Sequence, residues 1–304
     1  MKYLDLDFHC RLLTDAAFSA YKGSMLRGAL GASLRRGMCM TRRSDCDDCM
    51  LSKNCVFPRV FKPLPAGNLP APPPFCLSPD LEEKREYAAG ESFSFGLKLF
   101  SYATEYLPFF VQAFRAAGEK GVGKISPEGK FALAKVEFEG RSLYDAEEDR
   151  LEIPEPLNAP LPGINKDNDN GWGRIKVRLL SPLRHKAENR FSAKLEFIDL
   201  FHLVLRRIKA LSLLDGLAYQ LERDSYANLR AKAEETRIIE DNTRWKDWKR
   251  YSSRQDSMMN FGGLIGDITY EGPVAPFREF LKFAEIARIG KQTSFGLGQV
   301  KMEY

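Results

Sequence analysis

The sequence predicts an α+β protein in which two domains of similar architecture follow one another along a chain of 304 residues. Short segments of alternating apolar and polar residues are typical of strands, and longer segments with apolar residues at helical spacing are typical of helices. The order strand, helix, strand, strand, helix, strand occurs in the first half and again in the second. Hydrophobic residues make up 44% of the chain, which is enough for a separate core in each domain.

The first half, residues 1–155, begins with an alternating strand at 3–10. Ser24 is a candidate N-cap for a helix that continues to about Arg36 and carries an apolar stripe. The same patterns then predict a strand at 93–99, a helix at 102–117 and a strand at 131–138. A cysteine-rich insert (38–57) follows the first helix, and a proline-rich stretch (62–79) is expected to be an extended loop or a sheet edge.

Residues 152–173 contain four prolines and three glycines, so we expect the domain boundary near 155–170 and a second domain at 170–304. The second half is predicted to contain strands near 175–179, 236–249, 261–270 and 295–303, helices at 193–211 and 275–288, and an inserted charged helix at 216–235. Two successive βαββαβ units predict tandem ferredoxin-like (RRM-like) domains, each a four-stranded antiparallel sheet backed by two helices.

The bulk properties narrow the class of protein. A net charge of +5 and a pI near 8.8 permit a polyanionic partner without demonstrating one. The N-terminus has carboxylates where a secretory signal needs an apolar core, and no apolar stretch is long enough for a membrane span. Six cysteines in a chain of this length do not suggest a secreted disulfide scaffold. We therefore expect a cytoplasmic protein without membrane partners.

Four cysteines of the insert form a candidate metal site: Cys39, Cys46, Cys49 and Cys55. Two thiolates separated by two residues can take adjacent coordination positions, and four thiolates suit tetrahedral zinc. The spacing predicts a structural zinc, with an iron–sulfur cluster as the alternative. Free or disulfide-paired cysteines are the remaining interpretation.

A glycine-rich loop at 290–298 and a basic, aromatic segment before it are candidate RNA-binding elements. The loop surrounds a lysine and two hydroxyls with glycines, a composition that lets backbone N–H groups approach phosphates; its members are Gly290, Lys291, Thr293, Ser294, Gly296 and Gly298. The basic segment supplies Trp248, Lys249, Arg250 and Arg254, which suit base stacking and backbone contacts. A plain helix-to-strand turn and a half-buried strand are the respective alternatives.

Three segments resemble one family: Tyr21–Gly31 with its Gly-Ser-x-Leu-Arg-Gly pattern, residues 245–272, and Ile289–Val300. The chain resembles the CRISPR precursor-RNA-processing endoribonucleases of the RAMP superfamily. The resemblance implies cleavage of CRISPR repeat RNA to mature guide RNAs, by attack of the RNA's own 2′-hydroxyl and without a catalytic metal. It also allows other subunits of a CRISPR effector complex as partners. On this basis we also assign Arg35 and Arg36 to RNA binding.

The catalytic residues are harder to place, because many relatives carry a histidine on or beside the first helix and this sequence has none there. We rank as candidates one phenol, one amine, one guanidinium and one imidazole: Tyr21, Lys22, Arg27 and His202. His9 and His185 are more simply explained as solvated or packed side chains. The missing histidine favours a rival function, a non-cleaving RAMP subunit that holds repeat-derived RNA. A redox metalloprotein built on the cysteines is a third, weaker alternative.

Overall fold

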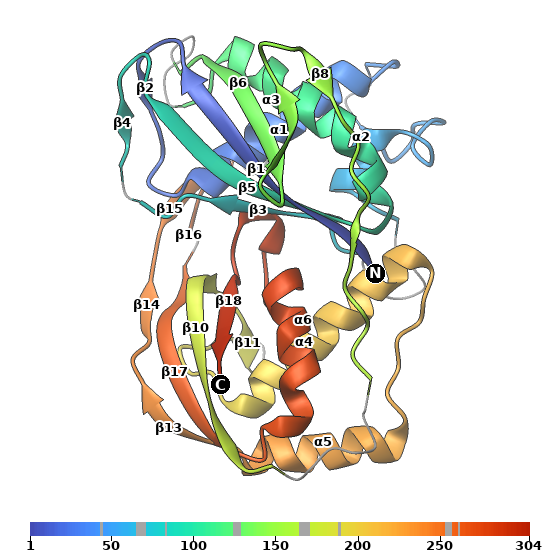
Figure 1. The fold of residues 1–304 in the computed structure, drawn as a ribbon, viewed down its shortest axis with the longest axis vertical. Helices are drawn as coiled ribbons and strands as arrows, with labels where there is room; N and C mark the ends of the chain where they lie inside the picture. Colours follow the sequence, from blue (N-terminus) through green and yellow to red (C-terminus); the bar gives the residue numbers. More distant parts are fainter. Residues whose placement is uncertain are drawn as a thin grey trace. The chain divides into compact units, whose positions relative to one another are not determined.

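The computed structural model divides into two units, Met1–Asn158 and Ala159–Tyr304 (Figure 1). It describes residues 1–42, 45–64, 71–82, 84–123, 129–163, 171–187, 190–252, 257–260 and 262–304. Each unit combines an antiparallel sheet with helices, so the predicted α+β class is confirmed.

The sheet of the first unit follows the ferredoxin-like order β3-β5-β1-β6. Its four main strands are β1 (Lys2–Leu12), β3 (Phe75–Pro79), β5 (Ser92–Phe100) and β6 (Phe131–Phe138). The edge is extended by β7 (Arg141–Asp145) and β8 (Arg150–Leu151), while β9 (Leu157–Asn158) pairs with β1 and β2 (Ala16–Ala17) pairs with β4 (Glu86–Tyr87). All of these pairings are antiparallel, and β3 is an edge strand supplied by the proline-rich stretch.

Two long helices, α1 (Lys22–Met38) and α3 (Leu107–Lys120), pack against each other in the first unit. The core between sheet and helices contains Phe8, Phe95 and Phe114, whose ring centroids are 4.7–5.2 Å apart. The predicted helix at 102–117 begins as a 3₁₀ turn, Ser101–Tyr106, before α3. The short helix α2 (Val56–Phe61), which begins at the end of the insert, lies against α1.

The second unit repeats the strand order as β13-β17-β10-β18. Its strands are β10 (Gly173–Leu183), β13 (Arg237–Asp241), β17 (Gly263–Gly272) and β18 (Val300–Glu303), with β14 (Arg244–Lys246) also paired to β17. The same order in both units confirms the predicted tandem ferredoxin-like fold.

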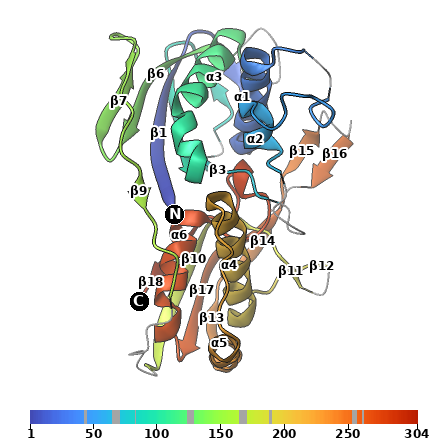
Figure 2. The same ribbon diagram turned by 90° about the vertical axis from the view of Figure 1, so that its right-hand side faces the viewer.

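Two helices, α4 (Phe197–Ser212) and α6 (Arg278–Ala287), lie together on one face of the second sheet (Figures 1 and 2). Phe197 and Phe201 of α4 pack against Phe277 with centroids 5.0 Å apart. The remaining elements are 3₁₀ turns at Leu213–Asp215, Ala275–Phe277 and Thr293–Phe295, the inserted helix α5 (Arg223–Glu235), and the short hairpins β11 (Lys186–Ala187) with β12 (Arg190–Phe191) and β15 (Lys249–Ser252) with β16 (Ser257–Asn260).

The last strand is shorter than the sequence predicts. The 3₁₀ turn Thr293–Phe295 and the glycine turn after it occupy the start of the predicted strand at 295–303, and β18 begins at Val300. Among the described helices, none has the length and apolar character needed to cross a membrane.

Candidate nucleic-acid interface

The glycine-rich loop follows α6, and the protein's own backbone holds it at three points. Ile289 N–H donates to Gly298 O (3.0 Å), which closes the loop on itself. Gly298 N–H donates to Pro182 O (2.9 Å) and Lys291 N–H donates to Arg184 O (2.9 Å). These two bonds fasten the loop to the end of β10 and to the residues that follow it.

The glycines are needed for these close backbone approaches. Gly298 has φ +74°, and a Cβ there would lie 1.7 Å from Ile289 O. Gly290 has φ +83°, and a Cβ would lie 2.8 Å from Arg184 O. Such positions admit only glycine without a backbone shift. The backbone that these two glycines approach is therefore the protein's own, and the N–H groups of Lys291 and Gly298 are already used.

A buried arginine that the sequence did not indicate holds the loop through hydrogen bonds. The Arg288 side chain is fully buried, and its Nη1 donates to Gly296 O (2.8 Å) while its Nη2 donates to Gln299 Oε1 (3.3 Å). Ser181 Oγ donates to the same Gly296 carbonyl (2.8 Å). Arg288 has φ +58°, a conformation that non-glycine residues rarely adopt. Its position directly before the loop was the only available signal.

Exposure divides the polar residues of the loop into two groups. The Lys291 side chain is exposed, whereas Thr293 and Ser294 are only 8% and 6% exposed. This burial runs against the expectation that both hydroxyls donate to RNA phosphates. The loop presents the Lys291 ammonium, and Gln292 beside it has φ +63° and accepts a hydrogen bond at Oε1 from Arg184 Nη1 (3.2 Å).

The hairpin β11–β12 lies next to this loop. The guanidinium carbon of Arg184 is 3.9 Å from the centroid of the Phe191 ring, and Phe191 is 42% exposed. Burial lowers the pKa of Arg184, opposed by the charge of Asp247. Within the same segment His185 is 1% exposed, and its Nε2 lies 2.9 Å from Lys194 O. Burial lowers the pKa of His185, so this histidine is a neutral core residue.

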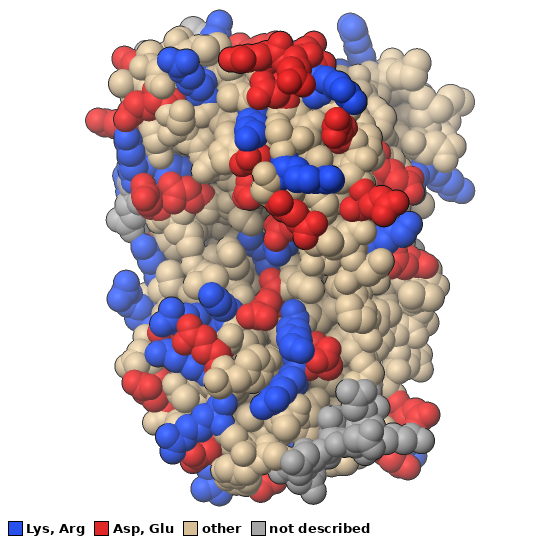
Figure 3. All heavy atoms as spheres, in the orientation of Figure 1, with Lys and Arg blue, Asp and Glu red and all other residues tan. Residues whose placement is uncertain are grey.

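Several cations of the sheet are paired with carboxylates, whereas two lysines at the loop and the hairpin are not, in the part of the chain that the structure describes. On the strands β10, β17 and β18, Lys176 and Arg178 share Asp267 at 3.5 and 3.7 Å, and Arg178 also meets Glu303 at 3.1 Å. In Figure 3, lysine and arginine side chains are mixed with carboxylates over this unit. Within the described residues, by contrast, no carboxylate forms an ion pair with Lys186 or Lys291. Unneutralised cations make the loop and hairpin a suitable surface for a polyanion.

The basic, aromatic segment is described in part. The Lys246 ammonium lies 4.9 Å from the centroid of the partly exposed Trp248 ring. Lys249 and Arg250 lie in β15, but their side chains are outside the described part of the chain, and Arg254 lies wholly outside it. Their assignment to RNA binding stays a prediction.

Two of the catalytic candidates are buried where α1 begins. Tyr21 is 6% and Lys22 only 2% exposed. Lys22 Nζ donates to Glu82 O (2.8 Å) and lies 3.6 Å from Asp80 Oδ2. An ammonium engaged in this way ties the helix start to the segment after β3, and its burial does not favour contact with a substrate.

The arginines of α1 lie on an aromatic stack from α2. Phe57 and Phe61 stack with centroids 5.3 Å apart, and the guanidinium carbons of Arg27 and Arg35 lie 5.0 Å from Phe61 and 5.7 Å from Phe57, respectively. Both arginines therefore contribute to packing of the insert through cation–π contacts. Arg36 on the same helix is exposed.

The remaining histidines have different surroundings. His202 Nε2 lies 3.2 Å from the Tyr226 hydroxyl, and burial, followed by the charge of Arg206, lowers the pKa of His202. A neutral imidazole at pH 7 is competent to accept a proton. His9 on β1 lies 2.8 Å from Glu137, within a row of paired charges on the sheet. Among the catalytic candidates, His202 therefore suits the role of a general base.

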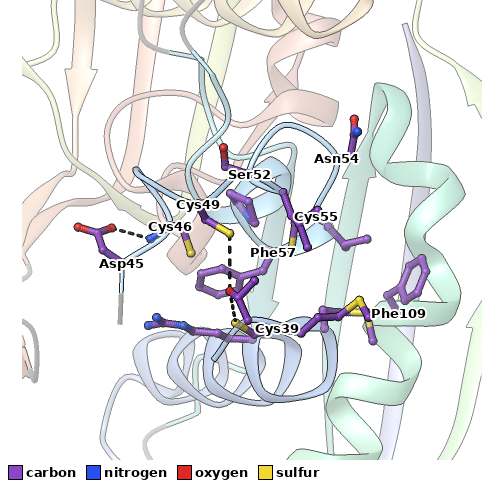
Figure 4. Close-up of a pocket in the computed structure, with 16 residues that line it drawn as sticks. Cys39, Asp45, Cys46, Cys49, Ser52, Asn54, Cys55, Phe57 and Phe109 are labelled. Carbon is purple, nitrogen blue, oxygen red and sulfur yellow. Dashed lines mark hydrogen bonds between the residues drawn. The ribbon is translucent and has the colours of Figure 1, made fainter. Parts of the chain in front are cut away.

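The four cysteines of the insert surround one pocket of about 260 Å³ with mostly apolar walls (Figure 4). Thr41 Oγ1 lies between two of them, 3.9 Å from Cys39 Sγ and 3.6 Å from Cys49 Sγ. Among the described residues, no group of three or more His, Cys, Asp or Glu side chains is arranged to hold a metal ion. The predicted structural zinc is therefore not supported, although all four cysteines line one pocket.

Family comparisons cover both units. Residues 177–300 match the model of the family described as CRISPR-associated endoribonuclease Cas6, and residues 1–156 match a family model described as an N-terminal domain. The first match includes β10, α4, β17, α6 and the glycine-rich loop. None of the curated proteins compared with the chain matches it in sequence.

Solved structures show the same fold over the whole chain. A Thermus thermophilus Cas6 (TTHB231) is 14% identical, with a TM-score of 0.56 over 99% of this chain and 98% of that one. A Cas6 (TTHA0078) product complex is 16% identical, with a TM-score of 0.57 over 100% of both chains. A chain of a partial Cas6-RT-Cas1–Cas2 complex is 12% identical, with a TM-score of 0.59 over 99% of this chain and 46% of that one.

Proposed function

The chain belongs to the CRISPR-associated endoribonuclease Cas6 family, and on that premise we propose that it cuts CRISPR repeat RNA in precursor transcripts without a catalytic metal. The family assignment makes it an RNA-cleaving enzyme. The substrate, the mechanism and the residues that act in it are the proposal.

The observation that carries the proposal is the construction of the glycine-rich loop. Buried Arg288 and Ser181 both donate to the Gly296 carbonyl, and glycines permit the close approach of the loop to neighbouring backbone. The Lys291 ammonium is left exposed, without an ion pair among the described residues. A fixed loop with one outward cation suits a phosphate of the RNA backbone, because little conformational freedom is lost on binding.

In the proposed reaction, a base takes the proton of the 2′-hydroxyl next to the scissile phosphate. The 2′-oxygen then bonds to phosphorus, the bond to the 5′-oxygen breaks, and an acid protonates that oxygen. The products are a 2′,3′-cyclic phosphate and a 5′-hydroxyl. His202 is our first candidate for the base, because burial keeps its imidazole neutral. The burial of Tyr21 and Lys22 supports a structural role for both.

The proposed partner is repeat RNA, and the proposed setting is the cytoplasm. Two structurally similar Cas6 proteins were solved as product complexes, and another similar chain is part of a Cas6-RT-Cas1–Cas2 complex. By analogy we include other CRISPR subunits among the partners of this chain.

The test incubates the full-length protein with repeat RNA in EDTA under single-turnover conditions. We expect a cut at one phosphate and a cyclic phosphate end, and a 2′-deoxy substitution at that position should abolish cleavage while binding persists. His202→Ala should slow cleavage by about 10²- to 10⁴-fold, the usual worth of general acid–base help. Tyr21→Phe, which removes only a hydroxyl from a buried side chain, is the control and should cleave normally.

One outcome would favour the alternative function, RNA binding without cleavage. Tight, specific binding of repeat RNA without any cleavage marks a non-cleaving RAMP subunit that holds the RNA in an effector complex. Burial of two of the four catalytic candidates is the observation that keeps this second function open. Cleavage that stops in EDTA and returns with added metal would instead refute the metal-independent mechanism.

A further inference from the structure

We propose that Phe191, on the hairpin β11–β12, is a stacking platform for an unpaired base of the bound RNA. The inference rests on the proposed function and adds a contact that is not part of the glycine-rich loop. It assigns the hairpin to the recognition of single-stranded RNA next to the phosphate that Lys291 contacts.

The first support is the geometry around the ring. Arg184 stacks on Phe191 at 3.9 Å, yet Phe191 remains 42% exposed. Lys186 is directly opposite Phe191 in the hairpin register, and its ammonium lies 5.6 Å from the ring centroid, at the long end of the cation–π range. An exposed aromatic ring that is oriented by an arginine offers a π-surface to any base, and a second cation nearby suits the phosphate attached to that base.

The second support is the connection between the hairpin and the loop. Arg184 O accepts the Lys291 N–H (2.9 Å), and Arg184 Nη1 donates to Gln292 Oε1 (3.2 Å). The residue that orients the ring therefore also holds the loop that carries the exposed lysine. Because one residue, through its backbone and its side chain, positions both features, a base on Phe191 and a phosphate at Lys291 can belong to the same strand of RNA.

The third support is charge. Lys186 and Lys291 have no ion pair within the described residues, whereas Lys176 and Arg178 of the neighbouring sheet share Asp267. Single exposed aromatic residues are common on protein surfaces and need no explanation. An exposed ring set between unneutralised cations favours nucleic acid over an apolar protein partner, because release of counterions drives binding.

The experiment measures the affinity of full-length Phe191→Leu and Phe191→Tyr for repeat RNA and for a short single-stranded uridine oligonucleotide. Leucine keeps an apolar side chain of similar reach but removes the π-surface, and tyrosine keeps it. Tyr304→Leu is the matched control, since Tyr304 is 55% exposed and stacks on Arg278 at 5.3 Å but lies at the end of β18. We expect Phe191→Leu to weaken binding roughly 5- to 150-fold, the range for one stacked base. Phe191→Tyr and Tyr304→Leu should bind like the wild type.

Two further readouts separate stacking from other effects. Stacking releases no counterions, so Phe191→Leu should leave the salt dependence of the affinity unchanged, whereas Lys291→Ala should reduce it. An abasic nucleotide scanned along the RNA should, at one position, weaken wild-type binding and not weaken Phe191→Leu further.

The outcomes distinguish the two proposals. Equal affinities of wild type and Phe191→Leu for both RNAs overturn the platform and leave the nuclease proposal intact. A wild type that does not cut repeat RNA overturns the nuclease proposal, while the abasic scan on bound RNA still decides the platform. If neither RNA binds the wild type, both proposals fail.

Discussion

Replacing Gly298 with alanine should strongly destabilise the second unit. The new Cβ would lie 1.7 Å from Ile289 O, and this distance must increase to at least 3.0 Å, because real Cβ contacts are essentially never shorter. The required shift disrupts the bonds from Ile289 N–H to Gly298 O and from Gly298 N–H to Pro182 O. Together with the cost of φ +74° for alanine, we expect a loss of about 2–5 kcal/mol of unfolding free energy.

Urea unfolding followed by tryptophan fluorescence measures this effect in the correct unit, because all three tryptophans (Trp172, Trp245 and Trp248) lie in Ala159–Tyr304. Gly216→Ala is the matched control: Gly216 has φ +72°, but a Cβ there meets no atom within 4 Å. This control should lose only the conformational part, about 1–2 kcal/mol. If Gly298→Ala unfolds at the same urea concentration as Gly216→Ala, close backbone approach does not explain the glycine, and the account of the loop is wrong.

Two further predictions concern charge. Lys291→Ala should weaken RNA binding and reduce the slope of log affinity against log salt by about one phosphate contact. The control Lys176→Ala removes a lysine that is already paired with Asp267, so it should change neither the affinity nor the slope. Equal salt slopes for the two variants would contradict the assignment of Lys291 to a phosphate. Burial lowers the pKa of His185, so as the pH falls the unfolded state takes up a proton before the folded state does. The unfolding free energy should therefore fall as pH drops through about 6.5 and level off below the lowered pKa of the folded state. Urea titrations from pH 8 to 5 should show a smaller fall for His185→Asn than for the wild type, and an equal fall would refute this explanation.

The fold could be predicted because its signals are local. Alternation along β1 places Leu4, Leu6 and Phe8 on one face, and all three are fully buried. The proline-rich stretch became the edge strand β3, one of the two structures expected for it. Element boundaries were less accurate, since α1 starts at Lys22 with Tyr21 as its N-cap and not at Ser24.

The site could be predicted only in outline, because its decisive contacts join distant parts of the chain. The sequence suggests that Lys22 is a reactive amine in a loop. In the structure its ammonium contacts Asp80 and Glu82, about 60 residues later in the chain. Arg288 is part of no recognisable motif, and its role follows from the Gly296 carbonyl that the folded loop directs toward it. Phe191 lies in a segment without a periodic pattern, so nothing local marked it as exposed beside the loop.

The paired charges of the second sheet have a bearing on selectivity. Asp267 lies within ion-pair distance of both Lys176 and Arg178, and Glu303 is a second partner of Arg178. Unpaired cations on the surface of this sheet would attract polyanions of any sequence, and unrelated transcripts would then compete with the proper RNA. Asp267 therefore lowers the net positive charge of this part of the sheet, and with it the attraction for polyanions other than the proper ligand.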